Sequence, residues 1–241
     1  MTQIAVISGG SSGIGLAFVA ALHKAGWTVY ASGRDPEKLA RLAQNYPGLH
    51  SFVCNVSDRE AVLTAAARIR AEVGKVDLLI SNAGGLTRLD FGAPGADGLD
   101  FVPQLRDNLE GAINWISAFL PLLRAAPKAR IIAIGSGYGV VPTTLSPIYS
   151  AAKAGLHMFL KALRYQLTGS GITVTEALPP LVDTPAVAHR TGKKVSAEAV
   201  VRKTLAASAA GREEVYIGQT TLLPLLLRLA PKFVEASAAK H

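Results

Sequence analysis

Short apolar runs alternate with longer amphipathic stretches along most of this chain. The short runs are rich in Val and Ile and end at glycines or polar residues, which is typical of buried strands. We expect strands at residues 3–7, 28–32, 50–54, 76–80, 129–136, 172–177 and 215–217. This alternation predicts an α/β protein with a doubly wound, mainly parallel sheet of seven strands and helices on both faces.

The amphipathic stretches between the strands repeat apolar side chains at helical spacing. Asp35 and Pro36 have the residue types of an N-cap and a first helical position, and Ser57 to Glu60 has the pattern of a capping box. We expect helices at residues 16–25, from 36, from 57, and at 101–123, 149–168 and 197–210. Because no internal repeat or linker interrupts this order, residues 1–241 are expected to form a single domain.

Composition favours a compact protein in a reducing compartment. Apolar residues make up 49% of the 241 residues and charged residues 17%, a balance that argues against disorder. No secretory signal is evident, and no apolar run reaches the roughly 18 residues that a membrane span needs. The single cysteine, Cys54, cannot form an internal disulfide and lies at an expected strand end. We therefore expect a cytoplasmic protein without a membrane span.

The formal charge of +8 raises the question of a nucleic-acid partner. The basic residues are scattered, apart from Arg190, Lys193 and Lys194, and no aromatic residues stand among them. A nucleic-acid module concentrates its basic residues on one face or one helix, so no nucleic acid is expected here. A basic surface can instead steer a phosphate-bearing cofactor or an acidic substrate.

A glycine-rich turn follows the first expected strand. Residues Ser8 to Gly15 read Ser-Gly-Gly-Ser-Ser-Gly-Ile-Gly and lead directly into an apolar helix. Glycines let the backbone approach a ligand closely, and a helix N-terminus offers free N–H groups and positive potential. The segment is therefore a candidate cradle for a pyrophosphate.

Tyr149 and Lys153 stand four positions apart in an expected helix, so their side chains share one face. An ammonium beside a phenol favours the phenolate and lowers the pKa of the tyrosine from its usual value of about 10. A phenol adjusted in this way can act as a general acid or base. Ser136 ends a buried strand, where open α/β sheets bind their ligands. The Tyr-x-x-x-Lys spacing also recurs by chance on amphipathic helices.

Two further motifs add to this pattern. Ser81 to Gly84 reads Ser-Asn-Ala-Gly after an expected strand, and Pro179 to Thr184 reads Pro-Pro-Leu-Val-Asp-Thr. Together with the glycine turn and the Tyr-Lys pair, they make the chain resemble the short-chain dehydrogenase/reductase family. The resemblance extends from about residue 3 to residue 218. It implies a Rossmann-type fold and an oxidoreductase that transfers a hydride between a nicotinamide and a carbonyl or secondary alcohol.

The resemblance also assigns roles to residues. Asn108, Ser136, Tyr149 and Lys153 match the catalytic tetrad of the family. Ser136 would bind the substrate oxygen, Tyr149 would donate the proton, and Lys153 would lower the tyrosine pKa and bind the nicotinamide ribose. Asn108 would hold a water in a proton relay to Lys153. The implied cofactor contacts, with no metal ligand among them, are Gly9, Ser11, Ser12, Gly13, Ile14, Gly15, Ser32, Arg34, Asn55, Val56, Asn82, Ala83, Gly84, Tyr149, Lys153, Pro179, Val182 and Thr184.

The end of the second expected strand favours NADP(H) over NAD(H). Sites selective for NAD place an acidic residue about twenty positions past the glycines, but here the strand ends in Ser32-Gly33-Arg34. Arg34 could pair with a 2′-phosphate through charge-assisted hydrogen bonds. Asp35 is a rival acidic residue, but it precedes a proline and is more simply a helix cap. Arg34 could also be a solvated surface residue.

The sequence departs from the family at two positions. Asn55 replaces the usual aspartate at the adenine pocket and removes its charge. Pro180 replaces a glycine, which removes one N–H group and fixes a backbone dihedral angle near the nicotinamide. Neither change removes a group that the proposed chemistry requires.

The substrate is less readable than the cofactor. The loops expected to line its pocket, at residues 85–87, 137–142 and from 181, are mostly apolar, which favours an uncharged or amphipathic carbonyl compound. Alternatives are an NAD-dependent alcohol or hydroxy-acid dehydrogenase of the same fold, or a non-catalytic NADP-binding sensor or scaffold.

The C-terminal stretch 220–234 repeats leucines at helical spacing. Core or subunit packing explains them most simply, and a peripheral membrane or partner-binding role is the alternative. The long expected helices near 105–123 and 149–168 would suit the homodimers and homotetramers that are common in the family.

Overall fold

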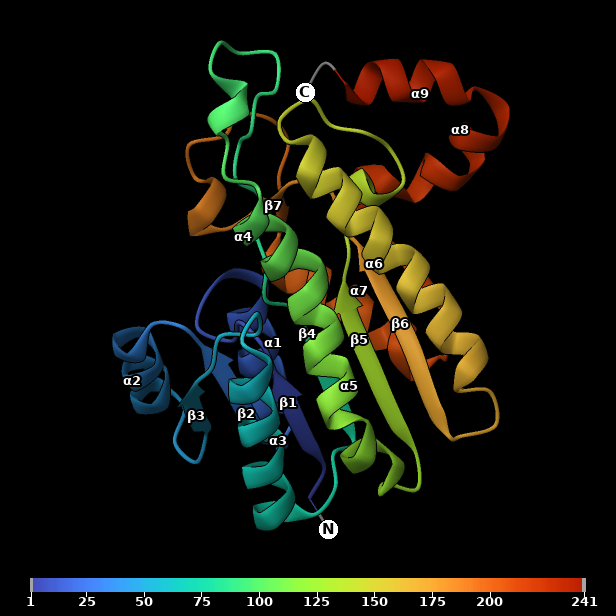
Figure 1. Cartoon of the computed structure of the whole chain (residues 1–241). Helices are drawn as coiled ribbons and strands as arrows, with labels where there is room; N and C mark the ends of the chain where they lie inside the picture. Colours follow the sequence, from blue (N-terminus) through green and yellow to red (C-terminus); the bar gives the residue numbers. More distant parts are fainter. Residues whose placement is uncertain (1, 240–241) are drawn as a thin grey trace.

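The computed structural model describes residues 2–239 and contains a parallel sheet of seven strands. The strands follow the order β3-β2-β1-β4-β5-β6-β9, and those from β3 to β6 in this order are labelled in Figure 1. Their bounds are β1 Ile4–Ile7, β2 Thr28–Gly33, β3 His50–Val53, β4 Leu78–Ser81, β5 Ala129–Ile134, β6 Ile172–Leu178 and β9 Glu214–Tyr216. Because the order reverses between β1 and β4, the predicted doubly wound Rossmann-type sheet is confirmed.

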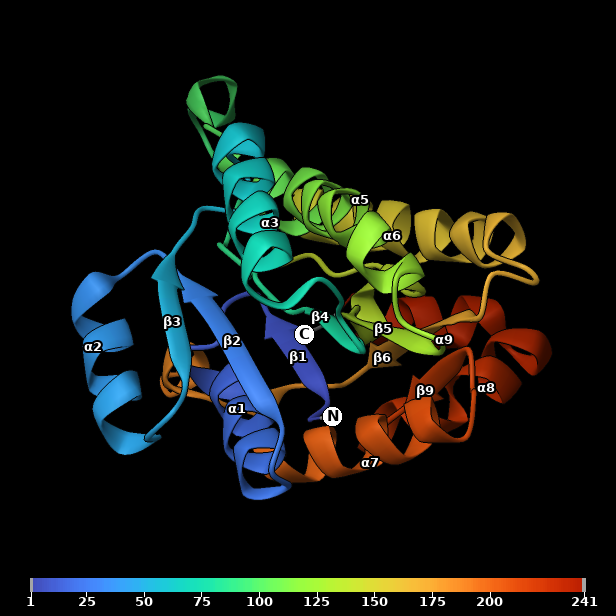
Figure 2. The ribbon, with the colours of Figure 1, turned by 90° about the horizontal axis from the view of Figure 1, so that it is seen from below.

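Helices cover both faces of this sheet. Figure 2 shows α3, α5 and α6 on one face and α1 and α7 on the other, with α2 beside β3. Their bounds are α1 Gly13–Lys24, α2 Pro36–Asn45, α3 Arg59–Val73, α5 Gly111–Arg124, α6 Pro147–Gln166 and α7 Ala197–Ala209. Two separate apolar clusters fill the space between the sheet and the two helix layers. The continuous apolar strands predicted from the sequence are those that have both faces buried.

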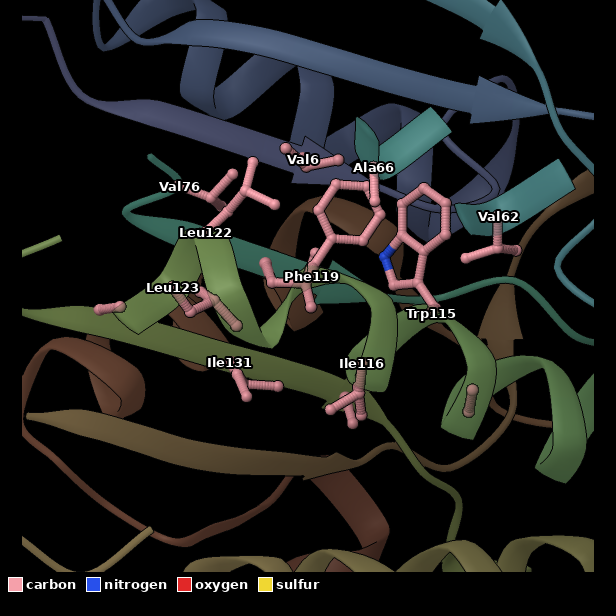
Figure 3. Close-up of a cluster of buried hydrophobic side chains, with 14 of the residues drawn as sticks. Val6, Val62, Ala66, Val76, Trp115, Ile116, Phe119, Leu122, Leu123 and Ile131 are labelled. Atoms are coloured by element: carbon pink, nitrogen blue, oxygen red, sulfur yellow. The ribbon is translucent and has the colours of Figure 1, made fainter. Parts of the chain in front are cut away.

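Two aromatic side chains of α5 form the centre of the first cluster. Trp115 and Phe119 are completely buried, with ring centroids 4.8 Å apart, and point toward Val6 of β1 and Ala66 of α3 (Figure 3). Aromatic groups of this size contribute a large share of the apolar area that a core buries. Their packing fixes α5 on the sheet. It thereby positions the residues just before α5, which contribute to the site described below.

The helix expected at residues 101–123 is interrupted. It comprises α4 (Val102–Leu105), a π-helical turn (Arg106–Glu110) and α5. A Cβ on Gly111 would lie 2.5 Å from Val56 Cγ2, so only glycine lets the helix approach Val56 so closely. Single π-helical turns widen a helix locally and occur often at functional sites. Asn108, a predicted tetrad member, lies in this turn.

One cap expectation is confirmed and one is wrong. Asp35 caps α2 and accepts hydrogen bonds from the amides of Glu37 and Lys38, with Pro36 at the first helical position. The cap of α3 is Asp58, which accepts from Ala61 N at 3.1 Å, so the predicted capping box beginning at Ser57 does not form. The hydroxyl of Ser57 instead donates to Asp107 Oδ1 at 2.7 Å, because a carboxylate is the stronger acceptor.

The single cysteine lies where the sequence placed it. Cys54 follows β3 and is buried, and this burial raises the pKa of its thiol to about 11. A thiol with so high a pKa carries little thiolate at neutral pH and is poorly reactive. This environment favours a structural role for Cys54 over a reactive one.

The C-terminal leucines are not core residues, which corrects that part of the sequence interpretation. The chain ends in α8 (Leu223–Leu229) and α9 (Pro231–Ala238), which lie beyond the end of the sheet near the start of α6 (Figure 1). Large apolar side chains on these helices are exposed, namely Leu222, Leu225, Leu226, Leu229 and Phe233. Over residues 2–239, no helix is both long enough and apolar enough to cross a membrane.

Candidate active site

The predicted site residues gather at one end of the sheet. The glycine turn follows β1, Asn82 follows β4, Ser136 follows β5, and Pro179 follows β6. Because all these strands are parallel, their carboxyl ends meet at the same edge, at the point where the strand order reverses. The topology therefore brings together motifs that are far apart in the sequence.

The glycine turn is folded tightly against Asn82. The side-chain amide of Asn82 donates to the carbonyl oxygens of Ser8 and Gly9, each at 3.1 Å. A Cβ on Gly15 would lie 2.0 Å from Gly9 O, so no other residue fits there. Ser12 is the N-cap of α1, and its side chain makes no capping hydrogen bond with the helix. The Ser12 side chain therefore does not compete with a ligand for the first amides of α1, which fits a pyrophosphate at this helix N-terminus.

The segment after β6 lies opposite this turn. A Cβ on Gly13 would lie 3.1 Å from Thr184 Cγ2, which places the threonine across the start of α1. Pro179 accepts a hydrogen bond from Gly137 N at 3.2 Å, and Val182 is buried in the short strand β7 (Val182–Asp183). β7 pairs with β8 (Val195–Ser196). This segment therefore lies beside the start of α1 and the loop after β5.

Arg34 lies at the end of β2 and is 70% exposed. Its Nη1 donates to Asp107 Oδ2 at 3.0 Å, an ion pair that the sequence analysis did not anticipate. The Ser11 hydroxyl lies beside Gly33, where an added Cβ would come within 2.9 Å of it. A cation and a hydroxyl thus border the same corner of the site.

Two residues predicted as cofactor contacts near this corner also make hydrogen bonds within the chain. The hydroxyl of Ser32 is completely buried and donates to Ile7 O at 3.5 Å, while its carbonyl oxygen accepts from Gly10 N at 2.8 Å. Through its carbonyl oxygen, Ser32 therefore holds the backbone of the glycine turn at Gly10. Asn55 is exposed, and its Oδ1 accepts from Ser57 N at 3.2 Å, whereas Val56 is buried.

Ser136 and Tyr149 lie together at the centre of the site. Ser136 Oγ accepts from Tyr138 N at 3.1 Å, and a hydrogen bond with Ser136 acts to lower the pKa of the Tyr149 phenol. Burial acts in the opposite direction and is the larger effect, so the pKa of Tyr149 is raised. The lowered pKa expected from the sequence is therefore wrong, because the desolvation of the phenolate outweighs the effect of its neighbours.

Lys153 is buried beneath Tyr149. Its Nζ donates to Ile134 O at 2.9 Å and lies 5.8 Å from the centroid of the Tyr149 ring. Burial lowers the pKa of Lys153 to about 8, and the charge of Glu176 opposes this shift. Near neutral pH the side chain is therefore an ammonium held in a largely apolar setting.

Asn108 braces the loop after β4. It is 1% exposed, its Oδ1 accepts from Gly85 N at 3.1 Å, and its Nδ2 donates to Gly85 O at 2.8 Å and Gln104 O at 2.9 Å. Gly84 has a φ of +144°, and a Cβ there would lie 2.6 Å from Asn108 Oδ1. Both the oxygen and the nitrogen of this amide already bond to backbone groups, so the Asn108 side chain fixes the loop after β4.

Several residues of the site were not predicted. Gln104 accepts from Thr87 N at 2.6 Å and donates to Ser146 Oγ, and Ser146 is the N-cap of α6. Gln104 thus links the loop after β4 to the helix that carries Tyr149. Ser8 Oγ accepts from the amides of Asn82 and Ala83 at 3.0 and 3.1 Å. A polar side chain among apolar neighbours was the signal available for Gln104.

Comparison with known proteins agrees with this geometry. Residues 3–194 match the family model for short chain dehydrogenase. The chain is 35% identical over 184 residues to the uncharacterized oxidoreductase DltE of Bacillus subtilis, with 74% of this chain and 71% of that one covered. It is 31% identical over 227 residues to sulfoacetaldehyde reductase 2 of Chromohalobacter salexigens, with coverage of 92% and 90%. The solved structure of a short chain dehydrogenase from Burkholderia cenocepacia in complex with NADP superposes with a TM-score of 0.88 at 25% identity, covering 98% and 97% of the two chains.

Proposed function

Because this chain belongs to the short-chain dehydrogenase family and is an oxidoreductase, we propose that it reduces a small ketone or aldehyde with NADPH. The observation that carries this proposal is the convergence of Ser136, Tyr149 and buried Lys153 at the carboxyl end of β5. The glycine turn and the start of α1 lie at the same end of the sheet and fit a dinucleotide.

The roles of the three side chains follow from their chemistry. NADPH, when bound, supplies the hydride that the carbonyl carbon receives. Tyr149 gives its phenolic proton to the carbonyl oxygen, and the Ser136 hydroxyl orients that oxygen. The Lys153 ammonium stabilises the phenolate that remains, and the Ile134 carbonyl holds this ammonium in place. Asn108 fixes the loop that borders the site.

Arg34 and Ser11 support the preference for NADP(H). Both border the corner at the end of β2, where the strand ends without a carboxylate facing the site, since Asp35 caps α2. An arginine binds a phosphate through parallel charge-assisted hydrogen bonds. The NADP bound to the Burkholderia cenocepacia relative supports the same choice.

We further propose that residues 1–241 work as a single domain in the cytoplasm and assemble as a homodimer or homotetramer. Met158 and Tyr165 are exposed on α6, at 63% and 82%, which supports a subunit contact there. The substrate is proposed to be an uncharged or amphipathic carbonyl compound, because the loop after β5 includes the buried Val141 and the chain around it is largely apolar.

A panel of aldehydes and ketones tests the proposed reaction through the consumption of NADPH. We expect turnover with at least one carbonyl compound, and we expect Tyr149→Phe to remove it while NADPH still quenches or shifts its fluorescence on binding. Binding of NADPH without turnover of any carbonyl would favour the sensor or scaffold alternative. Full activity of Tyr149→Phe would contradict the assignment of the proton donor.

A further inference from the structure

A buried carboxylate lies behind the catalytic side chains and has no role in the reaction proposed above. Glu176 stands on β6 opposite Ala133 of β5 and is completely buried. A Cβ on Gly135 would lie 2.3 Å from Glu176 Oε1, so the carboxylate packs directly against this glycine. Gly135 separates Ile134, the hydrogen-bond partner of Lys153, from Ser136. The carboxylate therefore borders the backbone that carries two parts of the site.

The second oxygen of this carboxylate is held by a histidine. Glu176 Oε2 lies 2.7 Å from His157 Nδ1, and this hydrogen bond is the main reason that the pKa of His157 is raised. Tyr149, Lys153 and His157 follow one another at intervals of four residues on α6, so they share one face of the helix. Glu176 is thus in position to interact with the face that carries both the tyrosine and the lysine.

Other charged groups surround the far side of this pair. Glu214 of β9 and Lys161 of α6 act on His157 with opposite effects on its pKa. Arg164 Nη1 lies 3.7 Å from Glu214 Oε1, and the Tyr216 hydroxyl donates to Glu214 Oε2 at 3.0 Å. Glu214 is therefore already engaged with its own partners. Toward Lys153, Glu176 is the charge that opposes the effect of burial.

The buried ammonium of Lys153 and the buried carboxylate of Glu176 carry opposite charges. An ammonium removed from water is costly unless a negative charge lies near it. Lys153 is 5% exposed, and the hydrogen bond of its Nζ to Ile134 O goes to a neutral carbonyl. Within residues 2–239, Glu176 Oε1 is buried and makes no hydrogen bond. The charge of Glu176 therefore offsets part of the cost of burying the Lys153 ammonium.

We propose that Glu176, held by His157, is a positioning residue that keeps Lys153 protonated beneath Tyr149 at the working pH. This inference rests on the proposed function, because it assigns Glu176 a role through Lys153. Without the negative charge, the ammonium loses its proton at lower pH, and the phenolate loses its stabilising partner. His157 holds the carboxylate in place through the hydrogen bond between its ring and Glu176 Oε2.

A metal site is the rival explanation of the same cluster. Ligand atoms of His157, Glu176 and Glu214 lie within 4.8 Å of one another. However, Glu176 Oε1 packs against Gly135, and Glu214 is bonded to Tyr216 and lies beside the Arg164 guanidinium. A divalent cation would have to compete with that arginine, so the geometry favours the charged pair.

The test is a pH titration of the lysine side chains by NMR, in protein labelled with 13C at lysine Cε. Lys153→Met identifies the Lys153 signal, which we expect to titrate near pH 8 in the unmodified protein. Glu176→Gln should lower this midpoint by about one pH unit or more, which is the loss of one nearby charge in a poorly solvated site. Glu214→Gln is the matched control and should leave the midpoint in place.

Glu176→Asp provides a second route if the glutamine variant does not fold. It keeps the charge but withdraws it by one methylene group, so the midpoint should fall by less than in Glu176→Gln. An unchanged Lys153 midpoint in either folded variant would overturn the proposal, and so would an equal shift in Glu214→Gln. If zinc at micromolar concentration moved the ring signals of His157 in unmodified protein labelled on histidine, the metal explanation would replace it.

Kinetics separate this inference from the proposed function. If a carbonyl substrate is found, kcat of Glu176→Gln should decline at lower pH than kcat of the unmodified protein, with the KM for NADPH unchanged. A fall of one unit in the midpoint corresponds to about a fivefold lower kcat at pH 8. If no carbonyl compound is reduced, the proposed function fails, and the lysine titration still decides whether Glu176 controls Lys153.

Discussion

Arg34 and Asp107, which are 73 positions apart, form an ion pair of 3.0 Å at the corner of the candidate cofactor site. Asp107 also accepts from Ser57 at 2.7 Å, so the carboxylate links the end of β2 and the segment before α3 to the π-helical turn. The arginine is thereby held at the rim of the site while most of its side chain remains exposed. A 2′-phosphate would meet a guanidinium whose direction is already restricted.

Replacing Arg34 should therefore change the choice of cofactor. In Arg34→Ala we expect NADPH to bind at least tenfold more weakly and NADH to bind as before, because hydrogen bonds to charged groups contribute about 1.5–3 kcal/mol. The measurement is titration by fluorescence of the reduced nicotinamide with each cofactor. Arg41→Ala, an exposed arginine on α2, is the control and should change neither affinity. Equal losses for the two cofactors would show that Arg34 does not read the phosphate.

The buried charge of Lys153 should cost stability. Its pKa in the folded protein is about 8, below the usual lysine value, so between pH 8 and about 10.4 the unfolded chain binds more protons and stability rises with pH. Below pH 8 the cost is present in full. Lys153→Met should therefore be more stable than the unmodified protein by about 1–3 kcal/mol at pH 7, less the lost hydrogen bond to Ile134.

Urea unfolding at pH 7 and pH 9.5 measures this difference. The advantage of Lys153→Met should shrink at the higher pH, since the lysine in the unmodified protein is then largely neutral. A variant that is less stable at pH 7 would mean that other contacts of Lys153 outweigh the burial of its charge. Active-site residues commonly support activity while lowering the stability of the folded protein.

The hydrogen bond between His157 and Glu176 predicts a second pH dependence. Because the pKa of His157 is raised in the folded protein, its contribution is complete below the ordinary value of about 6.5 and is lost as the pH rises through the raised value. His157→Gln should be less stable than the unmodified protein by about 1–2 kcal/mol at pH 5.5. Thermal unfolding at a series of pH values should show the gap narrowing toward pH 8.5. A gap that does not vary with pH would indicate a packing effect alone.

The glycine turn offers a steric test. A Cβ on Gly15 would lie 2.0 Å from the backbone oxygen of Gly9, which cannot move without breaking the turn. Gly15→Ala should therefore abolish binding of both nicotinamide cofactors and lower the melting temperature by several degrees, as strain of 1–3 kcal/mol would do. Gly85→Ala is the matched control, because a Cβ there meets no atom within 4 Å. Normal cofactor binding by Gly15→Ala would refute the placement of the cradle.

The sequence was sufficient to predict the order of the elements. Strands such as Ile4–Ile7 and Leu78–Ser81 are apolar throughout because both faces are covered, and this pattern is visible without any structure. The glycine turn and the Tyr149–Lys153 spacing were equally visible because each depends on residues close together in the chain. The structure brings these predicted residues together at one edge of the sheet.

The unpredicted features depend on contacts between distant residues. Asp107 reads as an ordinary surface acid until the fold brings it to Arg34. The raised pKa of Tyr149 follows from burial, which outweighs the expected effect of its neighbour four positions away. Glu176 stood in a strand whose other positions are apolar or carry threonine, and nothing nearby in the sequence pointed to His157.

The regular spacing on α6 has a consequence for how this chain can vary. Successive residues of an α-helix are turned by about 100°, so deleting one residue between Tyr149 and Lys153 would rotate every later side chain away from its present direction. This one deletion would break both the hydrogen bond between Lys153 and Ile134 and the hydrogen bond between His157 and Glu176. Insertions and deletions should therefore be rejected throughout this part of the helix, even where individual substitutions are accepted. Surface loops such as residues 91–98 should tolerate changes in length much better.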